Sequence, residues 1–329
     1  MIRRTVIGSF PALLPHYTLD EAIEACALLQ IPYVDLISDG EQRTDMIAYF
    51  DQIDGLTRTK MGTLEITGKI EPMKDVDDFY KIVDLKKAKR YLSSINKENV
   101  EIKVALTGPV SLGMTCALNG LKYYETIVDE KLYADISAAL VPIAERVLDA
   151  GAHLQIDEPC LSQKFMLPSH AQKILNSYLS SISDTAIDEG KVSMHVCGSI
   201  KGLPGLYDVL LNSNVGILSL AFSGRQESEN IDIVSKKSLE DRNKKLGLGI
   251  ASNIYPEDKR TVFERLSKLA EIIGPENIEF VHPDCGFRTK PKYDERNLAL
   301  EDMKRVESIL ENMKTASDSF FESLSQSIA

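Results

Sequence analysis

The segment Met194-His195-Val196-Cys197-Gly198 ends an apolar run with a glycine, a pattern typical of a strand that enters a loop. Side chains two residues apart in an extended segment point to the same side, so the imidazole of His195 and the thiol of Cys197 are neighbours. A second segment, His282-Pro283-Asp284-Cys285-Gly286, also follows an apolar run and adds another thiol. We expect His195, Cys197 and Cys285 to bind a zinc ion if the fold brings the two segments together.

The fold is predicted from short apolar runs that alternate with helical patterns. Strands are expected at about 5–7, 32–37, 102–106, 153–157, 191–195, 216–220, 245–250 and 278–281. Helices are expected at about 18–29, 76–94, 121–150, 171–188, 259–273 and 295–313. Eight strands alternating with helices predict an α/β fold, a (β/α)8 TIM barrel. A doubly wound open sheet is the alternative, but no Gly-x-Gly-x-x-Gly follows the first strand and no Walker loop occurs.

The domain organisation predicted from the same patterns is simple. Residues 1–314 form a single catalytic barrel, and residues 315–329 form a Ser-rich C-terminal tail to which no element is assigned. From about Leu56 to Ile70 no helical period fits, which indicates a hairpin-like excursion after the second strand. Thr18 and Glu21 have the spacing of a capping box at a helix start, and Gly274-Pro275 is a typical helix stop.

In a barrel of this kind, active sites gather at the C-terminal ends of the strands. His195 and Cys197 end the fifth strand and Cys285 follows the eighth, so closure of the barrel brings both segments to the same mouth. Other polar residues also follow strands, namely Ser9, Asp39, Glu41, Thr107, Asp157 and Glu158. This concentration of polar residues at strand ends predicts a catalytic rim.

Composition excludes several classes of function. With 38 Lys and Arg against 49 Asp and Glu, the net charge is −11, which argues against a nucleic-acid or anionic-membrane partner. No segment approaches the ~18 apolar residues of a membrane span. The N-terminal apolar run faintly resembles a signal peptide but is interrupted by Gly8, Pro11 and Pro15. Five irregularly spaced cysteines favour a reducing cytoplasm and metal or thiol chemistry over disulfides.

The predicted site residues each have a structural alternative. A lone Cys or His on an apolar strand is usually a packed core residue, but three soft ligands at strand ends favour a catalytic zinc with an open position. Ser9 either contacts a substrate carboxylate or is a turn residue. Asp157 or Glu158 binds an amino group or forms a structural ion pair with a neighbouring Arg or Lys. The charged loop of Asp39, Glu41 and Arg43 is most simply a solvated rim.

Six short blocks then suggest a known family. In order, they are Ile7-Gly8-Ser9-Phe10-Pro11, Asp39-Gly40-Glu41 with Asp45-Met46 and Tyr49-Phe50, Thr107-Gly108-Pro109-Val110, Gln155-Ile156-Asp157-Glu158-Pro159, His195-Val196-Cys197 and Pro283-Asp284-Cys285-Gly286. Together they resemble the catalytic C-terminal half of cobalamin-independent methionine synthase. The resemblance runs over essentially the whole chain, whose length is similar to that of the short members that lack the N-terminal half.

The resemblance implies a zinc-bound thiolate acceptor that attacks a methyl donor, because zinc lowers the pKa of the thiol. It also implies that His195, Cys197 and Cys285 bind zinc, and that Ser9 and Asp157 hold the amino-acid part of homocysteine. We include Glu41 among the predicted substrate-binding residues.

The chain departs from the family pattern at three positions. The fourth zinc ligand, a Glu after the sixth strand, aligns with Ala221, which leaves Cys160, Asp284 or Glu41 as substitutes. A Glu that holds the amino group of homocysteine aligns with Ala48, and the catalytic His after the seventh strand falls near Ala251-Ser252. Methylated folate needs its leaving nitrogen protonated, so a missing His favours methylcobalamin or a corrinoid protein as donor.

The sequence therefore predicts a cytoplasmic, zinc-dependent methyltransferase of methionine biosynthesis that acts on a small-molecule thiol, by default homocysteine. An alternative within the enzyme class is alkyl transfer to another thiol, such as coenzyme M. Ala48 and Ala221 replace acids of the family pattern, so the pattern no longer specifies the acceptor. An alternative from another class is a degenerate homologue that binds a partner without turnover.

Overall fold

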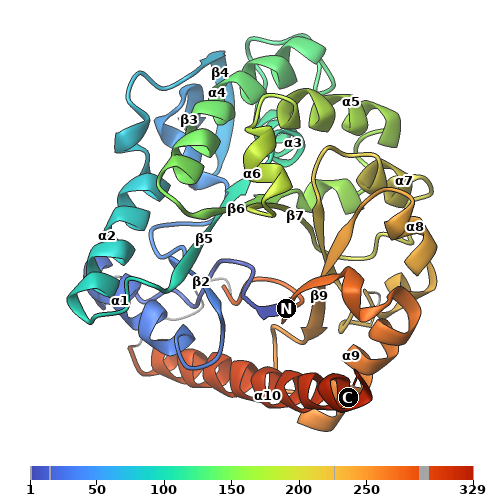
Figure 1. The fold of residues 1–329 in the computed structure, drawn as a ribbon. Helices are drawn as coiled ribbons and strands as arrows, with labels where there is room; N and C mark the ends of the chain where they lie inside the picture. The colour runs from blue at the N-terminus through green and yellow to red at the C-terminus, as the bar shows by residue number, and fades with distance from the viewer. Residues whose placement is uncertain (1, 15, 226, 289–295, 329) are drawn as a thin grey trace.

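The strands form one parallel eight-stranded sheet, in the order β1-β10-β9-β8-β7-β6-β5-β2, in a computed structural model that describes residues 2–14, 16–225, 227–288 and 296–328. Their bounds are β1 Arg3–Arg4, β2 Leu36–Ser38, β5 Glu101–Thr107, β6 His153–Asp157, β7 Val192–Val196, β8 Ile217–Ala221, β9 Lys245–Ala251 and β10 Ile278–Pro283. A parallel bridge between Thr5 and Leu36, and a hydrogen bond from Asp35 N to Arg4 O (2.9 Å), join the two outer strands. The sheet is thus closed, and the predicted (β/α)8 barrel is confirmed (Figure 1).

The helices surround this ring of strands (Figure 1). They are α1 Leu19–Gln30, α2 Tyr80–Ser94, α3 Pro109–Asn119, α4 Glu130–Asp149, α5 Pro168–Leu179, α6 Asp184–Asp188, α7 Leu206–Leu211, α8 Lys236–Glu240, α9 Lys259–Ile273 and α10 Arg296–Ile328. Short 3-10 helices are η1 Ala48–Gln52, η2 Val76–Asp78, η3 Pro159–Ser162, η4 Glu227–Asp232 and η5 Pro275–Asn277. In the described part of the chain, no helix has the length and apolar character needed to cross a membrane.

Local sequence signals explain several element boundaries. Thr18 Oγ1 accepts from Glu21 N (3.3 Å) while the Glu21 carboxylate accepts from Thr18 N (2.8 Å), so the predicted capping box at α1 is confirmed. Tyr33 N and Val34 N both donate to Gln30 O, and this turn makes β2 begin at Leu36, later than expected. The predicted excursion is an antiparallel hairpin of β3 Asp54–Arg58 and β4 Leu64–Glu71.

Two helical regions differ from expectation. The predicted helix at 121–150 is only α4, and a separate helix, α3, precedes it directly after Gly108. The last helix continues past residue 313 to Ile328, so residues 315–328 are helical although no element was assigned to them. Buried Ala316, Ser317 and Phe320 and an ion pair between Arg4 and Asp318 hold this extension against the barrel. The predicted division at residue 314 falls inside α10.

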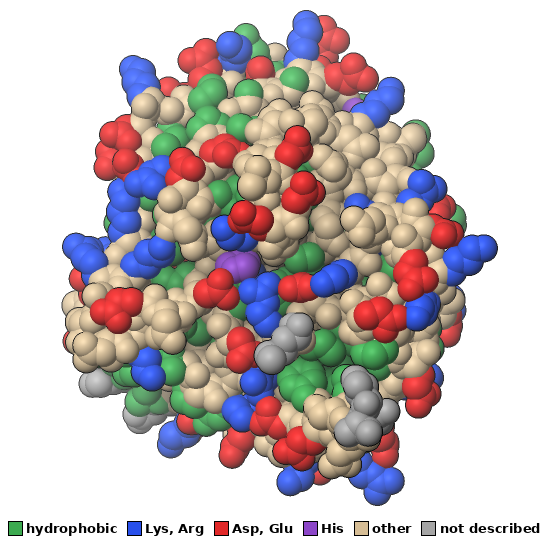
Figure 2. All heavy atoms as spheres, viewed as in Figure 1, with side chains coloured by type: hydrophobic (Ala, Val, Ile, Leu, Met, Phe, Trp, Pro, Cys, Tyr) green, Lys and Arg blue, Asp and Glu red, His purple; other side chains and the backbone are tan. Residues whose placement is uncertain are grey.

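Ion pairs join the strands at the end of the barrel where they begin. Arg3 donates to Glu101 (3.3 Å) and Glu279 (3.0 Å), and Lys245 also contacts Glu279 (2.9 Å). The face shown in Figure 2, viewed as in Figure 1, has acidic and basic side chains close together around its centre. This end of the barrel is therefore closed by matched charges.

Candidate metal centre

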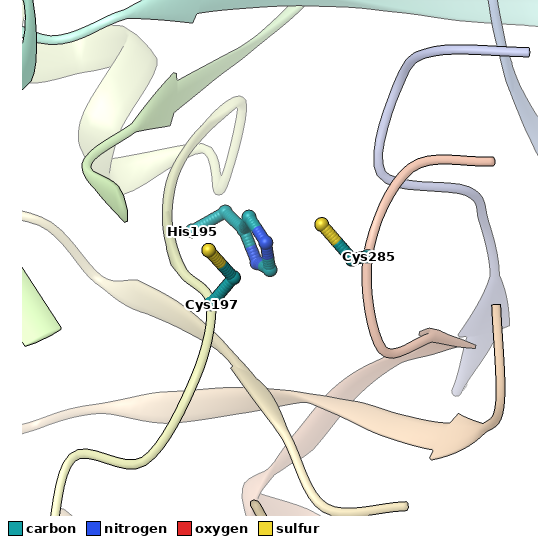
Figure 3. A group of neighbouring side chains, drawn as sticks. All are labelled: His195, Cys197 and Cys285. Carbon is teal, nitrogen blue, oxygen red and sulfur yellow. The ribbon is translucent and has the colours of Figure 1, made fainter. Parts of the chain in front are cut away.

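The two predicted metal-binding segments meet at the C-terminal mouth of the barrel. His195 lies on β7 and Cys197 just after it, while Cys285 follows β10 on the opposite side of the same space (Figure 3). The candidate ligand atoms of His195, Cys197 and Cys285 all lie within 4.8 Å of one another. They are the one group of this kind found among the described residues. The expectation that the fold brings these residues together is confirmed.

The surroundings of His195 leave one ring nitrogen available. Its Nδ1 lies 3.1 Å from the carbonyl oxygen of Ser219, and because a carbonyl only accepts, Nδ1 carries the proton. The Nε2 atom is then an unprotonated acceptor, and it is buried without a hydrogen-bond partner. A buried orphan nitrogen beside two thiols is the arrangement in which a histidine binds a metal.

The two thiols reinforce this interpretation. A hydrogen bond between the two thiols lowers the pKa of Cys197 and raises that of Cys285 well above its usual value, so Cys197 is the one that loses its proton more readily. Thiolate is the form that binds zinc, and two cysteines with one histidine match a catalytic zinc set with an open position. The residues present therefore fit the metal that the sequence predicts.

The three candidates for a fourth protein ligand, Asp284, Cys160 and Glu41, each contact other groups in the protein. Asp284 accepts hydrogen bonds from the backbone N–H groups of Phe222, Ser223 and Gly224 at 2.8–3.0 Å, and it holds the loop after β8. The thiol of Cys160 lies 3.6 Å from the Thr115 hydroxyl, outside the ligand group. The third candidate, Glu41, is paired with a lysine as described below.

The methyl group of Ala221 is buried at the end of β8, where the resemblance placed a carboxylate. Gly249 on the neighbouring strand leaves room beside it, because a Cβ at Gly249 would lie 2.9 Å from Ala221 Cα and 2.5 Å from an oxygen of Asp284. Among the described residues, the candidate metal group thus consists of three side chains, those of His195, Cys197 and Cys285.

A cavity of about 210 Å³ opens beside the metal group. All six predicted site residues line it, namely Ser9, Glu41, Asp157, His195, Cys197 and Cys285. Residues at the ends of five different strands (β1, β2, β6, β7 and β10) and in their loops therefore share one small space, as the barrel topology predicts.

Asp157 is buried in this cavity and is linked to the barrel interior. Its Oδ1 accepts from Gln155 Nε2 (2.7 Å), and Gln155 Oε1 accepts from Lys103 Nζ (2.5 Å). Burial raises the pKa of Asp157 and lowers that of Lys103 to about 7. The same Gln155 amide donates to Ile7 O (2.8 Å), which fixes the segment that carries Ser9.

Glu158, the second candidate for an amino group, points away from the cavity. Its carboxylate accepts from Val110 N (3.0 Å) and Ser111 N (2.7 Å) and so caps the start of α3. An acid at a helix N-terminus satisfies N–H groups that have no partner within the helix. For Glu158, the predicted role in amino-group binding is therefore wrong.

The loop of Asp39, Glu41 and Arg43 is not a solvated rim. Asp39 and Glu41 are buried, because α2 supplies buried partners that the sequence pattern did not reveal. Lys81 forms an ion pair with Glu41, and Asp84 pairs with Arg43 at 2.8 Å. Burial raises the pKa of Glu41, and its positive φ of 50° is unusual for a residue other than glycine.

Ser9 lies against the segment that carries Cys285. Its carbonyl oxygen accepts from Phe287 N (2.7 Å), and the rings of Phe10 and Phe287 meet edge to face at 5.3 Å. A Cβ at Gly286 would come within 2.2 Å of Ser9 Oγ, so any side chain there would turn the Ser9 hydroxyl away from its present position. The absence of a side chain at this position keeps the Ser9 hydroxyl at the cavity wall.

Sequence reasoning missed two contributors to the cavity wall, Met46 and Arg288. Arg288 Nη1 donates to the carbonyl oxygens of Glu41 (2.6 Å) and Thr44 (2.5 Å). The available signal was its position three residues after Cys285, in the block that carries a metal ligand. At the positions where the resemblance would place a Glu and a His, Ala48 is buried in η1, and Ser252 N donates to Glu257 (2.7 Å) after β9.

Comparisons with known proteins agree with this geometry. A family model described as "Cobalamin-independent synthase, Catalytic domain" matches residues 17–308. The methionine synthase of Methanothermobacter marburgensis is 32% identical over 294 residues, covering 87% of this chain and 86% of the relative. That of Methanothermobacter thermautotrophicus is 29% identical over 261 residues, covering 79% of each chain.

A solved structure has the same fold. The B12-independent methionine synthase from Shewanella sp. W3-18-1, in complex with selenomethionine, superposes with a TM-score of 0.66 at 18% identity. The match covers 98% of both chains. The similarity in fold therefore extends over nearly the full length of both chains.

Proposed function

The chain belongs to the family of cobalamin-independent methionine synthase catalytic domains, and from this membership we propose that it transfers a methyl group to the thiol of homocysteine at the mouth of the barrel. The methyltransferase class follows from the family. The observation that carries the specific proposal is the meeting of His195, Cys197 and Cys285 at a cavity that also contains two buried carboxylates.

The proposed metal is zinc, held by His195 Nε2 and the sulfurs of Cys197 and Cys285. When bound, zinc would lower the pKa of the acceptor thiol, so that the nucleophilic thiolate exists at neutral pH. Ser219 fixes the tautomer of His195 through its carbonyl oxygen. The position beside Ala221 is proposed to remain open to the substrate.

The amino-acid part of homocysteine is proposed to bind along the cavity wall. Asp157 has a carboxylate that is held in place by Gln155 and faces the cavity, so it suits the substrate ammonium group. Ser9 offers a hydroxyl on the opposite segment. Glu41 also lines the cavity, and its ion pair with Lys81 partly offsets the rise that burial causes in its pKa, so we assign it a secondary role beside the ammonium group.

We propose methylcobalamin, free or on a corrinoid protein, as the methyl donor. A methylated folate requires an acid that protonates its leaving nitrogen. Neither Ala251 nor Ser252 can supply one. His282 is buried in the barrel, and burial lowers its pKa to about 3, so near neutral pH its ring is uncharged and is a poor general acid. The five cysteines are all free, which fits a cytoplasmic enzyme.

The cavity favours homocysteine over coenzyme M as the acceptor. Coenzyme M carries a sulfonate and no ammonium group, so Asp157 would have no positive partner in it. A buried carboxylate next to a ligand without a countercharge is unfavourable.

Metal analysis with matched variants tests the proposal. The purified protein should hold one zinc per chain, and Cys197→Ser and Cys285→Ser should lose both zinc and methyl transfer from methylcobalamin to homocysteine. Cys160→Ser is the control, since its thiol lies outside the ligand group. Unchanged zinc content and activity in the first two variants would contradict the proposal.

A further inference from the structure

The cavity beside the metal group contains one cation that the proposed function does not use. We propose that Arg288 binds the α-carboxylate of the acceptor and thereby selects amino-acid thiols over thiols that lack a carboxylate. The inference rests on the proposed function, because it assigns the part of the substrate that lies farthest from the sulfur.

The backbone fixes the guanidinium of Arg288 at the cavity wall. Both N–H bonds of Nη1 are directed to carbonyl oxygens, those of Glu41 and Thr44. Guanidinium has five N–H donors in a planar fork, so the three on Nε and Nη2 remain. No acceptor for these three occurs among the residues that the structure describes. A carboxylate is the group whose two oxygens match this fork.

The charges around the cavity assign a partner to each end of an amino acid. Among its described lining residues, Arg288 is the only Lys or Arg, whereas three carboxylates are present. Two of these acids are already engaged: Glu41 pairs with Lys81, and Asp45 accepts from Ile47 N (2.9 Å) and Ala48 N (3.0 Å) at the start of η1. Asp157 is left for the ammonium group, and Arg288 for the carboxylate.

The chain also links Arg288 to the metal group. Arg288 follows Cys285 by three residues, and Phe287 between them is held by Ser9 and Phe10. One short, anchored stretch of backbone therefore sets the distance between the metal group, which would bind the substrate sulfur, and Arg288, which would bind the substrate carboxylate. Such a fixed spacing can discriminate between thiols of different length and charge.

Binding of methionine and of its decarboxylated analogue, 3-(methylthio)propylamine, tests the inference without turnover. Isothermal titration should show that Arg288→Gln weakens methionine binding by about 10- to 100-fold, the effect of losing a charged hydrogen bond. Binding of the analogue should not change. Arg288→Lys keeps the charge but not the fork, so its loss should be smaller.

Arg305→Gln is the matched control. Arg305 Nη1 also donates to two backbone carbonyl oxygens, those of Asn253 (2.9 Å) and Ile254 (2.7 Å), but its side chain does not line the cavity. This variant should bind both ligands like the wild type.

Two results would overturn the assignment of Arg288. Equal weakening of both ligands in Arg288→Gln would mean that the side chain only supports the loop, and no weakening would mean that the carboxylate binds elsewhere. If the wild type binds neither ligand, the proposed acceptor is wrong, and the inference fails with it.

Discussion

The two ends of the barrel differ in whether their polar groups are paired within the protein. Where the strands begin, Arg3, Lys245, Glu101 and Glu279 form a chain of ion pairs that satisfies each of these charges within the protein. Where the strands end, His195 Nε2 is buried without a partner, and Asp157 and Arg288 face a cavity. Buried polar atoms are nearly always satisfied in folded proteins, so an unpartnered ring nitrogen that lies beside two thiols and a cavity marks a place where a ligand can complete the site.

This difference separates residues that stabilise the barrel from residues that bind. Substitutions at the ion-paired end should change the free energy of unfolding and leave catalysis intact. Substitutions of the polar side chains that face the cavity, such as Asp157 and Arg288, should do the reverse.

The largest effect is expected for Asp157→Asn. An amide cannot pair with the substrate ammonium group, so kcat/KM for homocysteine should fall by about 10- to 100-fold. Zinc content and the temperature of unfolding should stay close to those of the wild type, because Asp157 lies outside the metal group and the amide oxygen of Asn can still accept from Gln155. A lower temperature of unfolding with an unchanged kcat/KM would mean that Asp157 stabilises the barrel and does not bind the substrate.

Gly286→Ala should come next. The added Cβ would meet Ser9 Oγ at 2.2 Å and turn this hydroxyl away, so we expect a higher KM for homocysteine and a loss of about 1 kcal/mol in the free energy of unfolding. Gly216→Ala at the other end is the control, since the nearest atom to its Cβ would lie at 3.9 Å. Urea unfolding measures the free energy of unfolding of both variants. A similar loss in both would mean that the contact between position 286 and Ser9 has no special effect.

Glu158 gives a pH-dependent prediction. Burial raises its pKa from 4.5 to about 7, so between these values the folded chain keeps a proton that the unfolded chain has released. The free energy of unfolding should therefore fall as pH rises from about 4.5 to 7 and then level off. Glu158→Gln removes this contribution. Urea unfolding of both proteins at pH 5, 6, 7 and 8 should show the wild type losing stability relative to the variant up to pH 7, and a constant difference would contradict the prediction.

The smallest effect is expected for Glu279→Gln. It removes the partner of Arg3 and Lys245 at a partly exposed site, so we expect a loss of about 1 kcal/mol in the free energy of unfolding. Zinc content and kcat/KM should not change. A clear loss of activity would show that the two ends are coupled.

The sequence predicted the barrel and the metal group because both depend on short patterns. Alternation of strands and helices specifies the topology, and topology alone brings Cys285 to His195 and Cys197. The missing acid at Ala221 was also visible in advance.

Contacts between distant segments could not be predicted. Nothing in the pattern of α2 indicates that Lys81 and Asp84 are buried partners of the loop after β2, so that loop was expected to be solvated. Helix α3 was not predicted, although Pro109 directly after Gly108 suits the first turn of a helix, where proline is favoured. Arg288 has no motif of its own and is identified only by the cavity that it lines.

The central claim is that the mouth binds the thiol of homocysteine at a metal held by His195, Cys197 and Cys285. The most direct measurement is the absorption spectrum of the cobalt-substituted protein during titration with homocysteine. We predict a new thiolate-to-metal band that saturates at one homocysteine per chain and is absent in Cys285→Ser. A spectrum that does not respond to homocysteine but changes with coenzyme M would contradict the claim.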